Sequence, residues 1–246
     1  MTLRQLDRDL YCIDHDLRFL GVCLGTRTSV VRLADGSVAL HGPGPITPED
    51  ATAIDQLGEV SALIAPNLMH HLYLGAAQTR WPHAKLFAPE RLQRKQPTLR
   101  IDTALSQGIA SAPLPEALSK TLEPLYVAGM PGLDEYAWLH AGSGTLILTD
   151  LAFNIRAPQP LWTRLFLHAN GGWDQLGPTR VLRSAIKNRA QARAGVTALL
   201  RHDFDRVIVA HGSVQDRGGR ELLQQSYRWL IEPDVADPAR TPLVER

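Results

Sequence analysis

The chain has 246 residues, of which 44% are hydrophobic and 6% aromatic. This composition can bury a sizeable core, and it excludes disorder as the main state. Lysine and arginine total 26 against 25 for aspartate and glutamate, so the formal net charge is +1. No strong overall field exists to attract nucleic acid or an anionic membrane. The expected partner is therefore a small molecule, or a protein.

Cysteine usage and the N-terminus both indicate a cytoplasmic protein. Cys12 and Cys23 each lie inside an apolar run, which suits neither a disulfide framework nor a cysteine-based zinc site. The first ten residues mix both charge signs with leucine, and the chain has no apolar run of about 18 residues. We expect buried thiols, a reducing compartment and no membrane span.

The chain opens with short apolar runs separated by turn residues, which predict an antiparallel meander of about four strands. Asp35-Gly36 between two of these runs is a hairpin signal. Thr47 and Pro48 then begin a helix, because they supply a capping hydroxyl and a proline suited to the first turn. The expected elements are strands at Leu10–Ile13, Phe19–Leu24, Ser29–Leu33 and Val38–Leu40 and a helix at Pro48–Leu57.

The segment Val60–Ala65 is an almost continuous apolar run, typical of a central strand buried on both faces. A helical pattern follows over Leu68–Trp81, and Lys85–Ala88 predicts another strand. Together these segments predict a strand–helix–strand unit within a parallel sheet. Region 89–115 is basic and broken by prolines, so we interpret it as surface loop with a short helix.

Strand patterns continue as far as Asp150, and helical patterns dominate beyond it. We expect residues 1–232 to form a single domain and residues 233–246 to form a flexible C-terminal tail. The further elements expected are strands at Leu122–Ala128, Glu135–His140, Thr145–Thr149 and Arg206–Ala210, and helices at Trp162–His168, Arg180–Ile186, Lys187–Arg201 and Arg220–Ile231.

Histidine or aspartate follows three of the expected strands. His70 and His71 come after the central strand, Asp150 follows the strand that succeeds a glycine-rich turn, and His211 follows the last strand. Imidazole and carboxylate groups at strand ends can hold Zn²⁺ or Fe on rigid elements. Each residue alone could instead be a surface, capping or loop residue, so the prediction of a metal site rests on their combination.

The order of these features resembles the metallo-β-lactamase-like hydrolases. In that superfamily a strand leads into the motif His-x-His-x-Asp-His, a later strand ends in aspartate, and a still later one ends in His-Gly. The runs Val60–Ala88, Thr145–Asp150 and Arg206–Gly212 match this plan, and residues 150–154 together with Glu135 resemble the branch called DUF4336. The resemblance spans nearly the whole chain. It implies an α/β fold built as a four-layer αββα sandwich.

The metal-binding motif of that superfamily is incomplete in this chain. Pro66 and Leu68 stand where the two opening histidines would be, and neither can bind a metal. Met130 stands in place of the histidine in the family's Gly-His-Thr-Pro-Gly turn. The resemblance therefore implies that one of the two metal positions has lost all three of its protein ligands.

The other metal position keeps its candidate ligands. His71 matches the last histidine of the motif, Asp150 the bridging carboxylate and His211 the terminal histidine, while His70 takes the place of the motif's aspartate. The resemblance thus implies one ion, Zn or Fe, held by His70, His71, Asp150 and His211.

A single bound ion implies metal-assisted hydrolysis of a small ester, thioester or lactone. Asp150 would then be catalytic as well as a ligand, and Glu135 or His70 would be the base. Asn67 is the candidate substrate-binding residue. Glu135 could instead be simply solvated at the mouth of a hairpin, and Asn67 could serve only to satisfy backbone groups.

Two other functions stay open. The missing ligands favour a degenerate pseudoenzyme that uses the old active-site pocket to bind a ligand or a protein. Nucleic-acid processing is opposed by the charge balance, and only the basic run Arg91–Arg100 supports it. The remaining histidines have no partner in the pattern and are interpreted as structural or surface residues: His15, His41, His83, His140, His168 and His202.

Overall fold

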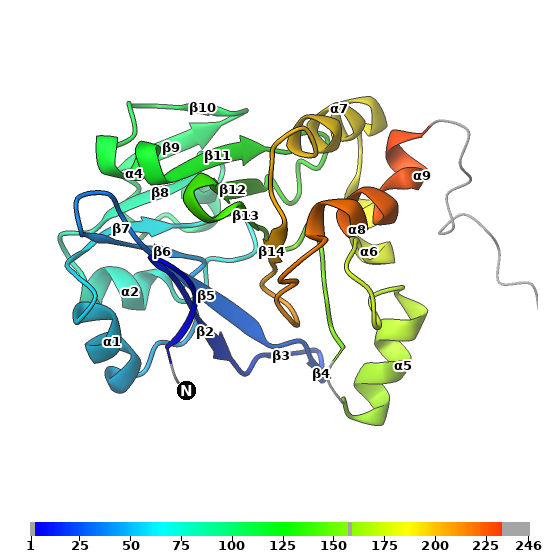
Figure 1. Cartoon of the computed structure of the whole chain (residues 1–246), viewed down its shortest axis with the longest axis horizontal. Coiled ribbons are helices and arrows are strands. Elements are labelled where there is room, and N and C mark those ends of the chain that lie inside the picture. Colours follow the sequence, from blue (N-terminus) through cyan, green and yellow to red (C-terminus); the bar gives the residue numbers. More distant parts are fainter. Residues whose placement is uncertain (1–2, 157–158, 233–246) are drawn as a thin grey trace, which may run out of the picture.

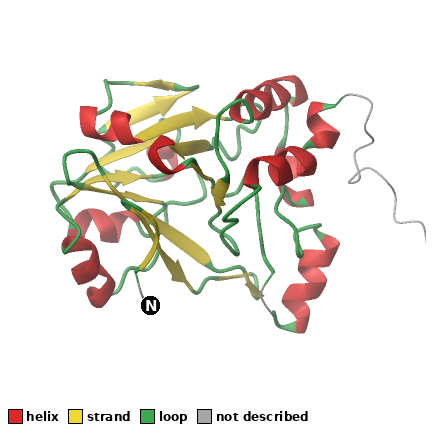
Figure 2. Ribbon diagram, viewed as in Figure 1, coloured by secondary structure: helices red, strands yellow, loops and turns green. Residues whose placement is uncertain are grey.

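The computed structural model describes residues 3–156 and 159–232. Two β-sheets face each other, and helices cover both outer surfaces (Figures 1 and 2). This arrangement is a four-layer αββα sandwich, so the fold class expected from the sequence is confirmed. The predicted tail, residues 233–246, lies outside the described residues.

Among the described residues the larger sheet has eight strands, and its middle part is parallel. Strand β7 lies between β6 and β8 and runs parallel to both, as expected for the central apolar run. The N-terminal strands pair antiparallel beside it. In spatial order the strands are β1 (Arg4–Asp7), β2 (Leu10–His15), β5 (Thr26–Arg32), β6 (Val38–His41), β7 (Val60–Ile64), β8 (Lys85–Pro89), β9 (Thr103–Ser106) and β10 (Ile109–Ala110).

The smaller sheet has four strands, in the order β11 (Leu122–Tyr126), β12 (Tyr136–His140), β13 (Thr145–Ile147) and β14 (Arg206–Ile208). The first three pair antiparallel, whereas β14 runs parallel to β13. Because parallel strands end at the same edge of a sheet, the residues that follow β13 and β14 emerge side by side. A separate hairpin pairs β3 (Arg18–Phe19) with β4 (Val22–Cys23).

The helices form the two outer layers. Figure 1 shows α1 and α2 against the larger sheet, and α6 to α9 on the side of the smaller sheet. No helix among the described residues has both the length and the apolar character needed to cross a membrane. The helices are α1 (Pro48–Asp55), α2 (Leu74–Arg80), α3 (Leu92–Lys95), α4 (Glu116–Thr121), the 3₁₀ turn η1 (Ala141–Ser143), α5 (Leu161–Ala169), α6 (Arg180–Ala185), α7 (Arg189–Leu199), α8 (Gly219–Ser226) and α9 (Arg228–Ile231).

Three apolar cores separate the four layers. Alternate residues of a strand face opposite sides of the sheet, and β7 shows the result. Leu63 packs with Ile54 and Leu74 of the helical layer, whereas Ile64 packs with Trp138 and Ile208 of the other sheet. A third core lies between the smaller sheet and helices α6 to α9. The layer between the two sheets ends where β7, β13 and β14 end.

The structure differs from the sequence prediction in several stretches, of which three bear on the site or its surroundings, and the helix predicted over Arg220–Ile231 is two helices, α8 and α9. Region 89–115 contains β9 and β10 in addition to a short helix, and their turn uses Gln107 and Gly108 at φ of 50° and 85°. The expected strand Phe19–Leu24 is instead a hairpin, in which Cys23 is partly exposed. The helix expected from Leu68 begins only at Leu74. In the last two cases the apolar pattern extends over a local turn that the spacing of residues does not reveal.

One buried arginine joins the two sheets. The guanidinium of Arg27 on β5 donates to Asp14 Oδ1 of its own sheet at 2.6 Å. It also donates to the carbonyl oxygens of Val209 at 2.5 Å and Gly212 at 2.7 Å, which belong to the segment after β14. These carbonyls lie on either side of His211, so Arg27 fixes the position of that segment against the larger sheet.

We predict that Arg27→Met lowers the free energy of unfolding by about 2 kcal/mol, because two carbonyls lose their donor. Urea unfolding measures this change. The matched control is Arg4→Met: Arg4 contacts the same Asp14 at 3.3 Å, but both side chains are half exposed. The control should shift stability by no more than about 0.5 kcal/mol. Equal losses in the two variants would contradict the proposed link between the sheets.

Candidate metal site

Three segments meet at the end of the layer between the sheets. His70 follows β7 of the larger sheet, and Asp150 and His211 follow β13 and β14 of the smaller one. His70 Nε2 lies 3.4 Å from Asp150 Oδ2, and His211 Nε2 lies 3.4 Å from Asp150 Oδ1. One ligand atom from each residue lies within 4.8 Å of the others. The donor set is two imidazoles and one carboxylate, which suits Zn²⁺ or Fe.

The ring of His211 is held in one orientation. Its Nδ1 lies 2.7 Å from the carbonyl oxygen of Gly25, the residue directly before β5 of the larger sheet. A carbonyl can only accept, so Nδ1 donates its proton to Gly25 and Nε2 is the ring nitrogen that faces Asp150. The ring of Phe153 packs against the imidazole with 4.6 Å between centroids. Such an outer hydrogen bond is the usual support of a metal-binding histidine.

Gly212 sets the backbone directly after His211. Its φ is +105°, and a Cβ built at this position would lie 2.2 Å from the carbonyl oxygen of Asn154. Asn154 N donates to His211 O at 2.9 Å, and Ser213 N donates to Asn154 O at 2.7 Å. The close approach of these two segments leaves no space for a side chain, which explains the glycine of the His211-Gly212 pair.

Asn67 shapes the loop that carries His70. Its side chain is fully buried, and its Oδ1 accepts hydrogen bonds from the backbone N–H groups of Met69 and His70, both at 2.8 Å. This side-chain turn replaces the first helical turn that the sequence pattern predicted. It thereby directs the side chain of His70 toward Asp150.

The amide nitrogen of Asn67 also reaches the smaller sheet. Nδ2 lies 2.8 Å from Asp150 Oδ2, 3.0 Å from Glu135 Oε2 and 3.0 Å from Thr149 Oγ1. The sequence suggested that Asn67 binds substrate or satisfies backbone groups. With no exposed surface and these partners, its observed role is the second one, and it also orients the Asp150 carboxylate.

Glu135 is a buried support and has no free oxygen to act as a base. Oε1 accepts from the backbone N–H groups of Thr149 at 2.8 Å and Leu151 at 3.3 Å. Oε2 accepts from the backbone N–H of Asp150 at 3.0 Å and from Asn67. The catalytic role expected for Glu135 is therefore replaced by a structural one: it holds the turn that presents Asp150. The sequence around a charged residue near a hairpin does not reveal whether its carboxylate accepts hydrogen bonds from a distant turn.

The structure places His70, and not His71, with the other two candidate ligands. His71 is buried but stands outside the cluster of ligand atoms. Burial lowers the pKa of its imidazole, and the charge of Lys95 lowers it further. Lys95 Nζ donates to the carbonyl oxygen of Leu68 in the same loop. The position of His71 differs from the sequence expectation that both histidines bind the ion, because successive side chains of the turn point in different directions.

Charge holds the three ligand residues together. Burial would lower the pKa of His70, but the charge and hydrogen bond of Asp150, with the charge of Glu135, outweigh it and raise that pKa. Burial would raise the pKa of Asp150, but the charges and hydrogen bonds of His70 and His211 lower it. Asp150 is therefore an anion between two imidazoles.

The positions that lack ligands are filled by buried, uncharged groups. Pro66, Leu68 and Met130 are all buried, and the last two pack into different apolar cores. In the part of the chain that the structure describes, His70, Asp150 and His211 are the one group of His, Cys, Asp and Glu residues close enough to share an ion. The donor set therefore fits one ion.

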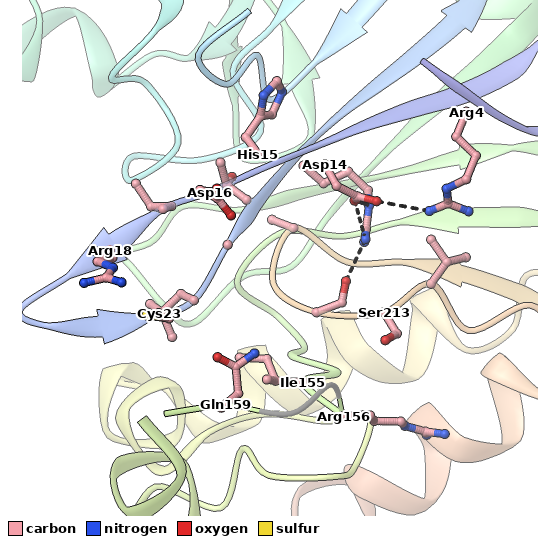
Figure 3. A pocket seen from close by; sticks show the side chains of 18 of the residues that line it. Arg4, Asp14, His15, Asp16, Arg18, Cys23, Ile155, Arg156, Gln159 and Ser213 are labelled. Carbon is pink, nitrogen blue, oxygen red and sulfur yellow. Dashed lines mark hydrogen bonds and ion pairs between the residues drawn. The ribbon is translucent and has the colours of Figure 1, made fainter. Parts of the chain in front are cut away.

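A cavity of about 640 Å³ lies beside this cluster (Figure 3). Gly25, Ala210 and Gly212 contribute to its wall, so it reaches the backbone on both sides of His211. Figure 3 shows Asp14 facing Arg4 on one wall and Arg156 on the opposite wall. The three ligand side chains do not line it. The cavity is thus a neighbour of the metal site and separate from its ligand atoms.

The model of a protein family described as a domain of unknown function, DUF4336, matches residues 7–192. The chain belongs to the DUF4336 family. Its fold is that of the metallo-β-lactamases: the structure superposes on one from Pontibacter korlensis with a TM-score of 0.65 and 13% identity, over 94% of this chain and 99% of the other.

Two other solved structures give the same result for this DUF4336 chain. DIM-1 metallo-β-lactamase exposed to ceftazidime has a TM-score of 0.64 and 13% identity over 95% of this chain and 97% of its own. The mono-zinc form of FIM-1 from Pseudomonas aeruginosa has a TM-score of 0.62 and 13% identity, over 94% of this chain and 96% of its own. No curated protein matches the sequence. At these identities the likeness establishes the fold.

We predict that Glu135→Gln destabilises the protein by about 2 kcal/mol, because an amide NH₂ would face backbone N–H donors in a buried site. Urea unfolding measures the loss. Glu123→Gln is the matched control, since Glu123 is exposed on β11 and should change stability by no more than about 0.5 kcal/mol. If the two variants proved equally stable, Glu135 would not be holding the turn before Asp150.

Proposed function

We propose that this chain binds one divalent transition-metal ion, zinc or iron, through His70, Asp150 and His211. The observation that carries the proposal is the meeting of three ligand atoms within 4.8 Å from two different sheets. A second support is the hydrogen bond from His211 Nδ1 to the Gly25 carbonyl, which orients Nε2 toward the other two ligand residues. The mono-zinc form of FIM-1, which has the same fold, is an example of a single zinc on this scaffold.

The proposed activity is hydrolysis of a small ester, thioester or lactone. When bound, such an ion supplies Lewis acidity and lowers the pKa of water, which makes hydrolysis feasible at neutral pH. The chain's own residues hold and shield the site: Asn67 and Glu135 fix the Asp150 carboxylate, and Phe153 packs on the His211 ring. The proposed partner is a small molecule, and the proposed compartment is the cytoplasm.

A second candidate function is a pseudoenzyme that binds a ligand without turning it over. Two observations favour it. Pro66, Leu68 and Met130 offer no ligand for a second ion, and Glu135 has no free oxygen with which to serve as a base. The cavity beside His211 would then be the binding site. Metal content and turnover separate the two functions.

Metal content is the first test. We predict that the protein loaded with Zn²⁺ or Fe²⁺ and then dialysed keeps about one equivalent, because three ligands suffice for a catalytic-type site. His70→Ala, Asp150→Ala and His211→Ala should each lose the ion, as measured by elemental analysis. His71→Ala is the matched control and should keep it. Loss of the ion from His71→Ala, or no ion in the parent protein, would contradict the ligand set.

Turnover is the second test. A panel of p-nitrophenyl esters, thioesters and lactones should be hydrolysed by the metal-loaded protein, and activity should fall to background in Asp150→Ala and after chelation. His71→Ala should retain the parent rate within the same assay. A fully loaded protein that turns over none of the panel would support the pseudoenzyme instead.

A further inference from the structure

His41, the last residue of β6, has a buried ring nitrogen without a partner. The residue is 2% exposed, and within the described part of the chain Nε2 makes no hydrogen bond. Buried polar atoms of native proteins almost always have a partner, which can be protein, water or a bound ligand. A partner that the polypeptide does not supply is therefore expected at this atom.

The register of the sheet shows where this side chain points. His41 pairs with Ser29 on β5 and Ile64 on β7. Ile64 and Ala39, which is two residues before His41, belong to the core between the two sheets, whereas Leu40 packs toward the helices. His41 therefore points between the sheets. It is also the last residue of its strand, at the end of the sandwich where His70, Asp150 and His211 meet.

Neighbouring atoms and charges confirm this location. A Cβ built on Gly42 would lie 3.8 Å from Pro66 and 4.0 Å from Thr149, the residues directly before Asn67 and Asp150. Burial lowers the pKa of His41 to about 3, and the positive charge of His70 contributes to the shift. The imidazole of His41 is thus neutral at physiological pH.

His41 is nevertheless outside the group of ligand atoms that lie within 4.8 Å of one another. The structure therefore does not place His41 where it could bind the same ion directly. A small polar molecule between Nε2 and the ligand residues would satisfy both facts, because waters and ligands commonly bridge buried polar atoms. Outer-shell groups of this kind contribute strongly to metal affinity.

We propose that the missing partner of His41 Nε2 is an oxygen atom of a water molecule or small ligand held beside the ion, which makes His41 a positioning residue of the metal site. The inference rests on the single-ion function proposed above. It extends that function by assigning a fourth residue, from a strand that carries no metal ligand. The neutral imidazole can donate to or accept from the bound oxygen according to its tautomer.

The test compares His41→Leu, His41→Gln and the parent protein. Zinc affinity is measured by competition with a chromophoric chelator, and coordination by the visible spectrum of the Co²⁺ form. We expect His41→Leu to bind zinc about 10- to 100-fold more weakly and to alter the Co²⁺ spectrum. His41→Gln should restore part of the affinity, because an amide can also donate or accept.

Two controls separate this role from a packing role. His15→Leu changes another buried histidine whose Nδ1 lacks a partner, but His15 Nε2 lies 2.8 Å from Thr28 Oγ1 and the residue is not one of the clustered ligands, so zinc affinity should not change. The metal-free His41→Leu protein should melt no lower than the parent, because the substitution removes an unsatisfied buried polar atom.

The outcomes distinguish this inference from the function on which it rests. A parent protein that binds no zinc would overturn both. A parent that binds one equivalent while His41→Leu binds it equally well, with the same Co²⁺ spectrum, would overturn only the role of His41. Unchanged zinc affinity with a lower melting temperature of the metal-free variant would assign His41 to packing and would also overturn the proposal.

Discussion

The carboxylate of Asp150 lies between two imidazoles at the end of the layer between the sheets, and the local structure is arranged to keep it there. Burial of a charge is unfavourable unless it is paired and hydrogen-bonded. Asp150 has His70 and His211 on either side and Asn67 as a direct donor. Glu135 supports it from behind by accepting the backbone N–H groups of the turn that carries it. The site is thus built from buried and partly buried ligand residues that are supported by the fully buried side chains of Asn67 and Glu135.

The strand plan could be read from the sequence because it depends on local patterns. The apolar run before Pro66 indicated a central parallel strand, and the runs ending at Asp150 and His211 indicated neighbouring strands of one sheet. Parallel strands end at a common edge of a sheet, so the pattern alone predicted that Asp150 and His211 belong to the site. The short strands β9 and β10 did not, because strands of four and two residues are too short to show a detectable periodicity.

The roles of the buried polar residues could not be read in this way. Adjacent histidines are equivalent in a sequence, and only the side-chain turn of Asn67 determines that His70 faces Asp150. Glu135 and Asn67 were singled out as functional, but the partners of Asn67 lie 68 to 83 residues away in the chain, and the backbone partners of Glu135 lie 14 to 16 residues away. His41 gave no signal, because its direction follows from pairing with strands on both sides. Tertiary packing decides such roles, and composition does not.

The contacts of β5 with the His211 segment have a consequence for ion binding. Gly25 accepts from the His211 ring, and Arg27 donates to carbonyl groups on both sides of the same residue. Folding of the two sheets against each other therefore fixes this ligand before any ion arrives. A preorganised ligand loses little conformational entropy when it binds, so much of the entropic cost of forming the site is already met by folding of the sandwich.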